Sequence, residues 1–169
     1  MTTTNASSGQ TPAPSLIDHP ALLAGVRQVF EDAIPFNKVI GLRVGSLDPR
    51  APELHFDNRP ELIGNFTRGM LHGGVISAVL DVAGGLGAML AILERHLGQN
   101  ESIEAQLARF TRVGTIDLRV DYLRPGRGQH FRTRSETLRS GARVVVVRAD
   151  LLNESDDLIA SGVGAYTAG

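Results

Sequence analysis

The chain has 169 residues, and its 17 lysines and arginines nearly match its 18 aspartates and glutamates, for a formal net charge of −1. This balance argues against nucleic acid, and against an anionic membrane surface, as the main partner. The sequence contains no cysteine, which excludes disulfides, thiolate metal sites and cysteine nucleophiles.

Residues 1–15 are rich in threonine, serine, proline and glycine and contain no apolar core. We expect a disordered tail there rather than a signal peptide, followed by one domain over residues 16–169. The apolar run that comes nearest to a membrane span is interrupted by Asp81. We therefore expect a cytoplasmic protein without a membrane partner.

Residues 18–34 have the apolar spacing of a short amphipathic helix. Asp18 is a candidate N-cap, Pro20 suits the first turn, and Pro35 is expected to end the helix.

Residues 65–90 contain the most apolar stretch of the chain, which follows two short predicted strands over 41–47 and 53–56. The stretch opens with polar loop residues, passes through a His-Gly-Gly triplet at 72–74, and then stays apolar for about six helical turns. A helix that is apolar nearly all round is a buried one. We expect it to end near residue 98.

From residue 115 the apolar spacing changes to a period of two, which is typical of strands with one face in solvent. The elements predicted here are a surface helix over 102–110 and strands over 115–122, 130–138, 143–152 and 158–167. Short turns join the last three strands, so the sheet should be antiparallel, and it must cover the apolar helix. The predicted fold is α+β, with a curved antiparallel sheet wrapped around one long central helix.

Asp81 is the one charged group within the apolar run. The residues one turn away on either side are small or hydroxylated, so no cation of the same helix neutralises the carboxylate. An unpartnered carboxylate in an apolar setting is costly. Asp81 is therefore either a structural carboxylate at an interface or the working group of a site.

The helix N-terminus at Gly73 and Gly74 is a second candidate feature. Glycines there leave backbone N–H groups open to close approach, and the helix dipole favours negative charge. Such a place can hold a carbonyl oxygen that becomes an oxyanion. The alternative is a turn that needs glycine for steric reasons alone.

The spacing between these two features predicts how they can cooperate. Eight residues at 1.5 Å each place Asp81 about 12 Å along the helix axis from the Gly73 amide. One thioester carbonyl cannot contact both within a single chain, so a shared site needs two subunits. The small residues of 83–88 favour either a close subunit contact or close packing against the chain's own sheet.

Taken alone, His72 and Asn65 are weak signals, because each can simply stabilise its own loop. The five histidines show no metal-ligand spacing, and neither a nucleophile elbow nor a P-loop is present.

Taken together, Asn65, the triplet at 72–74 and Asp81 nine positions after His72 resemble the signature of hotdog-fold acyl-CoA thioesterases of the phenylacetate-pathway type. The segment Tyr-Leu-Arg-Pro-Gly at 122–126 is similar to a strand end of that family. Residues 34–38 also resemble the lead-in of a proteobacterial subgroup that acts on medium- and long-chain acyl-CoA.

The resemblance implies a role for each matching residue. It makes Asp81 the general base or nucleophile and the Gly73 amide the oxyanion donor, while Gly74 keeps the helix start open. It also implies that His72 and Asn65 orient the thioester and the attacking water.

The family pattern further places the coenzyme A phosphates on basic residues near strand ends, here Arg124, Arg127 and Arg143. It implies an acyl-CoA substrate, no metal or redox cofactor, and a homodimer that can pair into a dimer of dimers.

Two other functions fit parts of the pattern. A hotdog dehydratase for hydroxyacyl thioesters would use His72 with Asp81, but the chain lacks the His-Phe-Pro-type loop that such enzymes usually carry. A non-catalytic acyl-CoA sensor would need a DNA-binding or partner domain, and residues 1–40 hold one predicted helix and no basic cluster.

Overall fold

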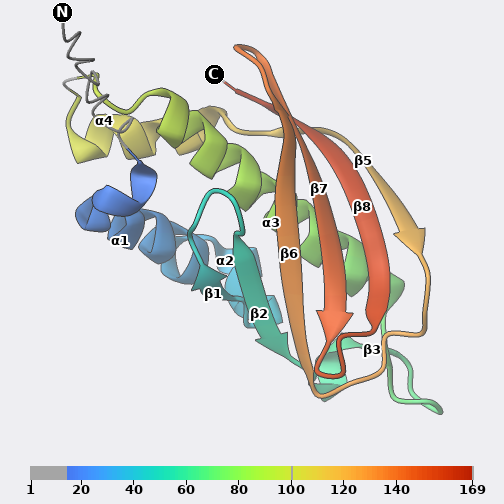
Figure 1. The fold of residues 1–169 in the computed structure, drawn as a ribbon. Helices are drawn as coiled ribbons and strands as arrows, with labels where there is room; N and C mark the ends of the chain where they lie inside the picture. Colours follow the sequence, from blue (N-terminus) through green and yellow to red (C-terminus); the bar gives the residue numbers. More distant parts are fainter. Residues whose placement is uncertain (1–14, 100, 169) are drawn as a thin grey trace, which may run out of the picture.

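The computed structural model describes residues 15–99 and 101–168, and it contains a six-stranded antiparallel sheet that curves around one long helix (Figure 1). The strand order is β1-β2-β6-β7-β8-β5. The strands are β1 (Arg43–Ser46), β2 (Glu53–Asp57), β5 (Thr115–Tyr122), β6 (His130–Ser140), β7 (Val144–Asn153) and β8 (Leu158–Thr167). The predicted α+β hotdog arrangement is confirmed, whereas the predicted tail lies outside the described residues apart from Ser15.

The central helix is α3 (Gly73–Arg95), which lies inside the curve of the sheet (Figure 1). Leu80, Leu86 and Leu90 are buried, and each fully buried leucine stabilises the fold by roughly 1.5–3 kcal/mol. By length and composition α3 is also apolar enough to cross a membrane, but 61% of that stretch is buried within the fold. Its apolar character is therefore accounted for by its position in the core.

The N-terminal helical region is divided where one helix was predicted. A 3₁₀ turn over Leu16–Asp18 precedes α1 (Pro20–Gln28), which continues into a π-type turn and then α2 (Pro35–Ile40). The predicted N-cap at Asp18 is wrong: the cap position is occupied by His19. Pro35 begins α2 as well as ending the previous segment, because proline is well tolerated in the first turn of a helix.

Two short strands that the sequence did not reveal position the start of α3. They are β3 (Ile63–Asn65) and β4 (Met70–Leu71), which pair with each other. The His72 amide donates to the Leu62 carbonyl at 2.8 Å, and the Leu71 amide donates to the Gly126 carbonyl at 2.9 Å. The helix start is therefore held to backbone on both sides.

The predicted surface helix after α3 is present as α4 (Ile103–Ala108), and none of its residues is buried. The Ser102 hydroxyl accepts from the Ala105 amide and caps it. The segment packs along α1, and the rings of Phe30 and Phe110 meet edge to face at 5.5 Å.

Candidate active site

Asp81 lies on a strip of α3 that the sheet does not fully cover. The members of this strip recur every three or four residues, and each is small, hydroxylated or acidic apart from one valine. They are Gly74, Ser77, Ala78, Asp81, Val82 and Gly85, and none of them is classed as fully buried. Spacing of three and four puts them on one face of the helix, which we call the open strip. The Asp81 carboxylate is therefore accessible from outside the core.

The Asp81 carboxylate has a partner that the sequence did not reveal. The Thr115 hydroxyl donates to Asp81 Oδ1 at 2.8 Å. Thr115 begins β5, and the pairing with β8 shifts register between Thr115 and Asp117. Such an irregularity redirects a side chain within a strand, and simple alternation along β5 could not have shown it. One oxygen of Asp81 is thus engaged by Thr115.

A buried phenol lies behind the backbone of Asp81. The Tyr166 hydroxyl donates to the Asp81 carbonyl oxygen at 3.2 Å, and the side chain has no exposed surface. Burial raises the pKa of Tyr166 well above its usual range, and the nearby Asp81 charge adds to this rise. Tyr166 is therefore a neutral hydrogen-bond donor at physiological pH.

The start of α3 leaves one amide free. His72 is the N-cap, and its Nδ1 accepts from the Gly74 amide at 2.8 Å. The His72 carbonyl accepts from the amides of Val75 and Ile76 at 3.0 and 3.2 Å. Within residues 15–99 and 101–168 the Gly73 amide has no hydrogen-bond acceptor. Gly73 therefore supplies the available donor at the positive end of the helix dipole.

The cap also selects the tautomer of the neutral His72 ring. Because Nδ1 accepts a hydrogen bond, the proton of the neutral ring lies on Nε2, which remains a donor. Tyr122 also holds the first residue of the helix, because its hydroxyl donates to the Gly73 carbonyl at 3.1 Å. His72 is exposed, so its Nε2–H is open to a ligand.

Asn65 is the exposed last residue of β3, at the start of the loop that leads to β4. Its side-chain oxygen accepts from the Thr67 hydroxyl at 2.7 Å and from the Arg68 amide at 3.2 Å. These contacts form a local turn of the kind that asparagine favours. The side-chain amide of Asn65 retains its donor hydrogens, so a contact with substrate stays a prediction.

The three predicted phosphate-binding arginines do not lie close together within one chain. Arg124 and Arg127 follow β5, and Arg124 donates to the Leu158 carbonyl at 2.9 Å. Arg143 lies in the turn between β6 and β7, at the opposite end of β7. A ten-residue strand at about 3.3 Å per residue spans roughly 30 Å. Arg124 and Arg127 therefore share one end of the sheet, without Arg143.

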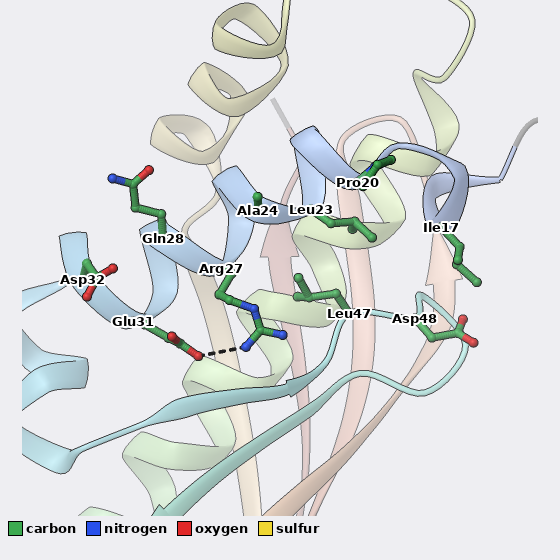
Figure 2. A pocket seen from close by; sticks show the side chains of 10 residues that line it. All are labelled: Ile17, Pro20, Leu23, Ala24, Arg27, Gln28, Glu31, Asp32, Leu47 and Asp48. Carbon is green, nitrogen blue, oxygen red and sulfur yellow. Dashed lines mark hydrogen bonds and ion pairs between the residues drawn. The ribbon is translucent and has the colours of Figure 1, made fainter.

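A pocket of about 660 Å³ opens elsewhere, between α1 and the turn that joins β1 and β2 (Figure 2). Leu23 and Leu47 contribute apolar lining, and Arg27 pairs with Glu31 at 3.0 Å. None of its lining residues belongs to α3 or β5. Among the described residues no group of three or more histidine and acidic side chains is placed to hold a metal ion.

The curved antiparallel sheet around a long central helix is the arrangement of the hotdog fold. The comparison with protein families agrees: the model of the Thioesterase superfamily matches residues 68–160. The chain belongs to this superfamily, as the resemblance of the motifs had predicted.

Two curated relatives and one solved structure are similar over most of their length. The medium/long-chain acyl-CoA thioesterase YigI of Salmonella typhimurium is 44% identical over 144 residues, which cover 85% of this chain and 92% of that protein. The YigI protein of Escherichia coli K12 is 43% identical over the same shares. A crystal structure of a Shewanella oneidensis protein related to the thioesterase superfamily has a TM-score of 0.82 and 42% identity, covering 92% of this chain and all of that one.

Proposed function

We propose that this chain hydrolyses the thioester bond of medium- or long-chain acyl-CoA and releases the free acid and coenzyme A. The observation that carries the proposal is the pair of groups on α3: the Gly73 amide, which has no acceptor among the described residues, and the Asp81 carboxylate on the open strip. The names of the YigI relatives support the substrate class.

The site is shared by two subunits in this proposal. The Gly73 amide and Asp81 are about 12 Å apart along one helix, so the amide of one subunit acts with the carboxylate of the other. Two further features favour a second copy. In the part of the chain that the structure describes, the outer edge of β5 pairs with no other strand, and its Ile116 and Tyr122 are 54% and 55% exposed. Unpaired edges and exposed apolar side chains favour association. A homodimer, able to pair into a dimer of dimers, would cover both.

The chemistry follows from the hydrogen bonds. Thr115 occupies Oδ1 of Asp81, so Oδ2 is the oxygen that takes a proton from the attacking water. Water adds to the thioester carbonyl, and the resulting oxyanion is stabilised by the Gly73 amide of the other subunit. Collapse of this intermediate breaks the carbon–sulfur bond, and the coenzyme A thiolate takes the proton from Asp81. Direct attack by Asp81 to form an anhydride is the alternative route.

The remaining predicted residues bind and orient substrate in this scheme. The Nε2–H of His72 and the side-chain amide of Asn65 are donors for the thioester or the water. Arg124 and Arg127 bind coenzyme A phosphates at the end of β5, and Arg143 contributes only if another subunit brings it near. The reaction needs neither a metal nor a redox cofactor, because the helix amide and Asp81 supply the charge stabilisation and the base. We place the enzyme in the cytoplasm.

A panel of acyl-CoA substrates, assayed with a free-thiol reagent, tests the proposal. Wild-type protein should release thiol most efficiently from medium or long acyl chains, and Asp81→Asn should reduce the rate. Loss of a hydroxyacyl substrate without thiol release would instead indicate a dehydratase. Acyl-CoA binding without turnover would indicate a sensor.

A further inference from the structure

Tyr166 is a buried polar side chain that the proposed reaction does not use. It lies in β8, far from Asp81 in sequence, and its hydroxyl donates to the Asp81 carbonyl oxygen at 3.2 Å. A hydroxyl with no access to water is costly unless it is bonded. This hydrogen bond therefore fixes the phenol to the helix at the residue that carries the proposed base.

Two glycines make the space that the phenol occupies. A Cβ atom at Gly84 would lie 2.0 Å from the Tyr166 hydroxyl oxygen, and one at Gly164 would lie 2.7 Å from it. Side chains at either position would have to displace the ring. Gly84 lies on α3 and Gly164 on β8, so helix and sheet both leave room for this one hydroxyl.

β8 also pairs with β5, the strand that begins at Thr115. Tyr166 is the cross-strand partner of Thr115. The next residue, Thr167, donates from its amide to the Gly114 carbonyl at 2.8 Å. Its hydroxyl oxygen accepts from the Gly114 amide at 2.7 Å. One end of β8 therefore bonds to the backbone of Asp81 and to the start of β5.

We propose that Tyr166 is a positioning residue, which holds Asp81 on α3 at the distance from Thr115 that the reaction requires. This inference rests on the proposed thioesterase function. Tyr166 does not contact substrate; it acts by fixing the backbone of Asp81, while Thr115 fixes one carboxylate oxygen. A small displacement of a catalytic group is enough to slow a reaction severely.

The structure provides a matched control for removing this hydroxyl. Ser135, on β6, is also buried, and its hydroxyl donates to the α3 carbonyl of Ala83 at 3.2 Å. Both Tyr166→Phe and Ser135→Ala therefore remove one bond from a sheet hydroxyl to a helix carbonyl. The bond lost in Tyr166→Phe ends at Asp81, whereas the bond lost in Ser135→Ala ends at Ala83.

The test compares kcat and KM for an acyl-CoA with the thermal unfolding midpoint of each variant. Tyr166→Phe should lower kcat about tenfold with KM nearly unchanged, as expected for a group that acts on the transition state. Ser135→Ala should retain the wild-type kcat, although its unfolding midpoint also falls. A wild-type kcat for folded Tyr166→Phe, or equal losses of kcat in both variants, would overturn the proposal.

A double-mutant cycle then asks whether Tyr166 acts through Asp81. In an Asp81→Asn background, assayed at high enzyme concentration, Tyr166→Phe should reduce kcat less than about twofold further, since linked groups are not additive. A full tenfold further loss would show a role independent of Asp81 and overturn the inference.

A second variant keeps the test usable if Tyr166→Phe fails to fold. Gly164→Ala crowds the same hydroxyl and should also lower kcat, whereas a wild-type kcat in that variant would count against the proposal. Absence of thiol release by the wild-type protein would instead overturn the proposed function, and the role of Tyr166 with it.

Discussion

The two sides of helix α3 carry different kinds of residue. The side within the sheet has large aliphatic side chains such as Leu80, Leu86 and Leu90, all of them buried. The open strip has Gly74, Ser77, Ala78, Asp81, Val82 and Gly85. Leucines fill a core at high density, whereas small residues let another backbone or a ligand approach. The covered side thus packs the core, whereas the open strip carries the proposed base.

This division predicts that a change on the covered side should affect stability first. Leu90→Ala removes a buried side chain more than two helical turns from Asp81, and the resulting cavity should lower the free energy of unfolding by about 2–5 kcal/mol. Chemical denaturation would measure the loss. The kcat of the folded fraction should stay at the wild-type value; a large fall in that kcat would contradict the division.

A change at Asp81 should show the opposite behaviour. Asp81→Ala removes the proposed base from a partly exposed position, so kcat should fall by about 10²-fold or more. The unfolding midpoint should change little, because alanine favours the helix and no large cavity forms. Thiol release and thermal unfolding are measured on the same preparation. Wild-type thioesterase rates in this variant would remove the assignment of Asp81.

Thr115 should have a smaller effect on the same reaction. Thr115→Val keeps the shape of the side chain but removes the hydroxyl that donates to Asp81 Oδ1. We expect kcat to fall about tenfold, because the carboxylate loses one hydrogen bond. Thr115→Ser restores the hydroxyl and is the control. Equal rates for the valine and serine variants would exclude the role of the hydroxyl.

The smallest expected effect concerns alkaline pH and the buried phenol of Tyr166. Its pKa is raised in the fold by burial, so its contribution to stability is complete below the ordinary tyrosine pKa of about 10 and is lost as pH rises above that value. Unfolding midpoints of wild type should therefore fall above pH 10, and those of Tyr166→Phe should fall less steeply. Parallel pH curves would contradict this.

The sequence predicted the elements whose apolar pattern extends over many residues. α3 lies in one long apolar run, and β5 to β8 lie where the spacing changes to a period of two; their residues were found nearly as predicted. β3 and β4, of three and two residues, are too short for any period to be visible. The helix that begins at Pro35 was not predicted, because a proline that ends one helix can also occupy the first turn of the next.

The sequence also located the groups of the candidate site but not their contacts. Asp81, His72 and Gly73 stand out in the sequence itself, because a charge or a glycine interrupts a local pattern. Thr115 and Tyr166 lie 34 and 85 residues from Asp81. They reach it only through a register shift in β5 and the packing of β8 against α3, which no local pattern encodes.

The most direct test of the shared site is complementation between two inactive variants. Gly73→Pro removes the free amide at a helix position that accepts proline, and Asp81→Asn removes the base. Each variant alone should be nearly inactive. After the two are unfolded and refolded together, half of the dimers are mixed, and each mixed dimer holds one intact site. Activity should therefore return to about a quarter of the wild-type value. If no activity returned although mixed dimers had formed, the amide and the carboxylate would not act across subunits, and the shared site would be refuted.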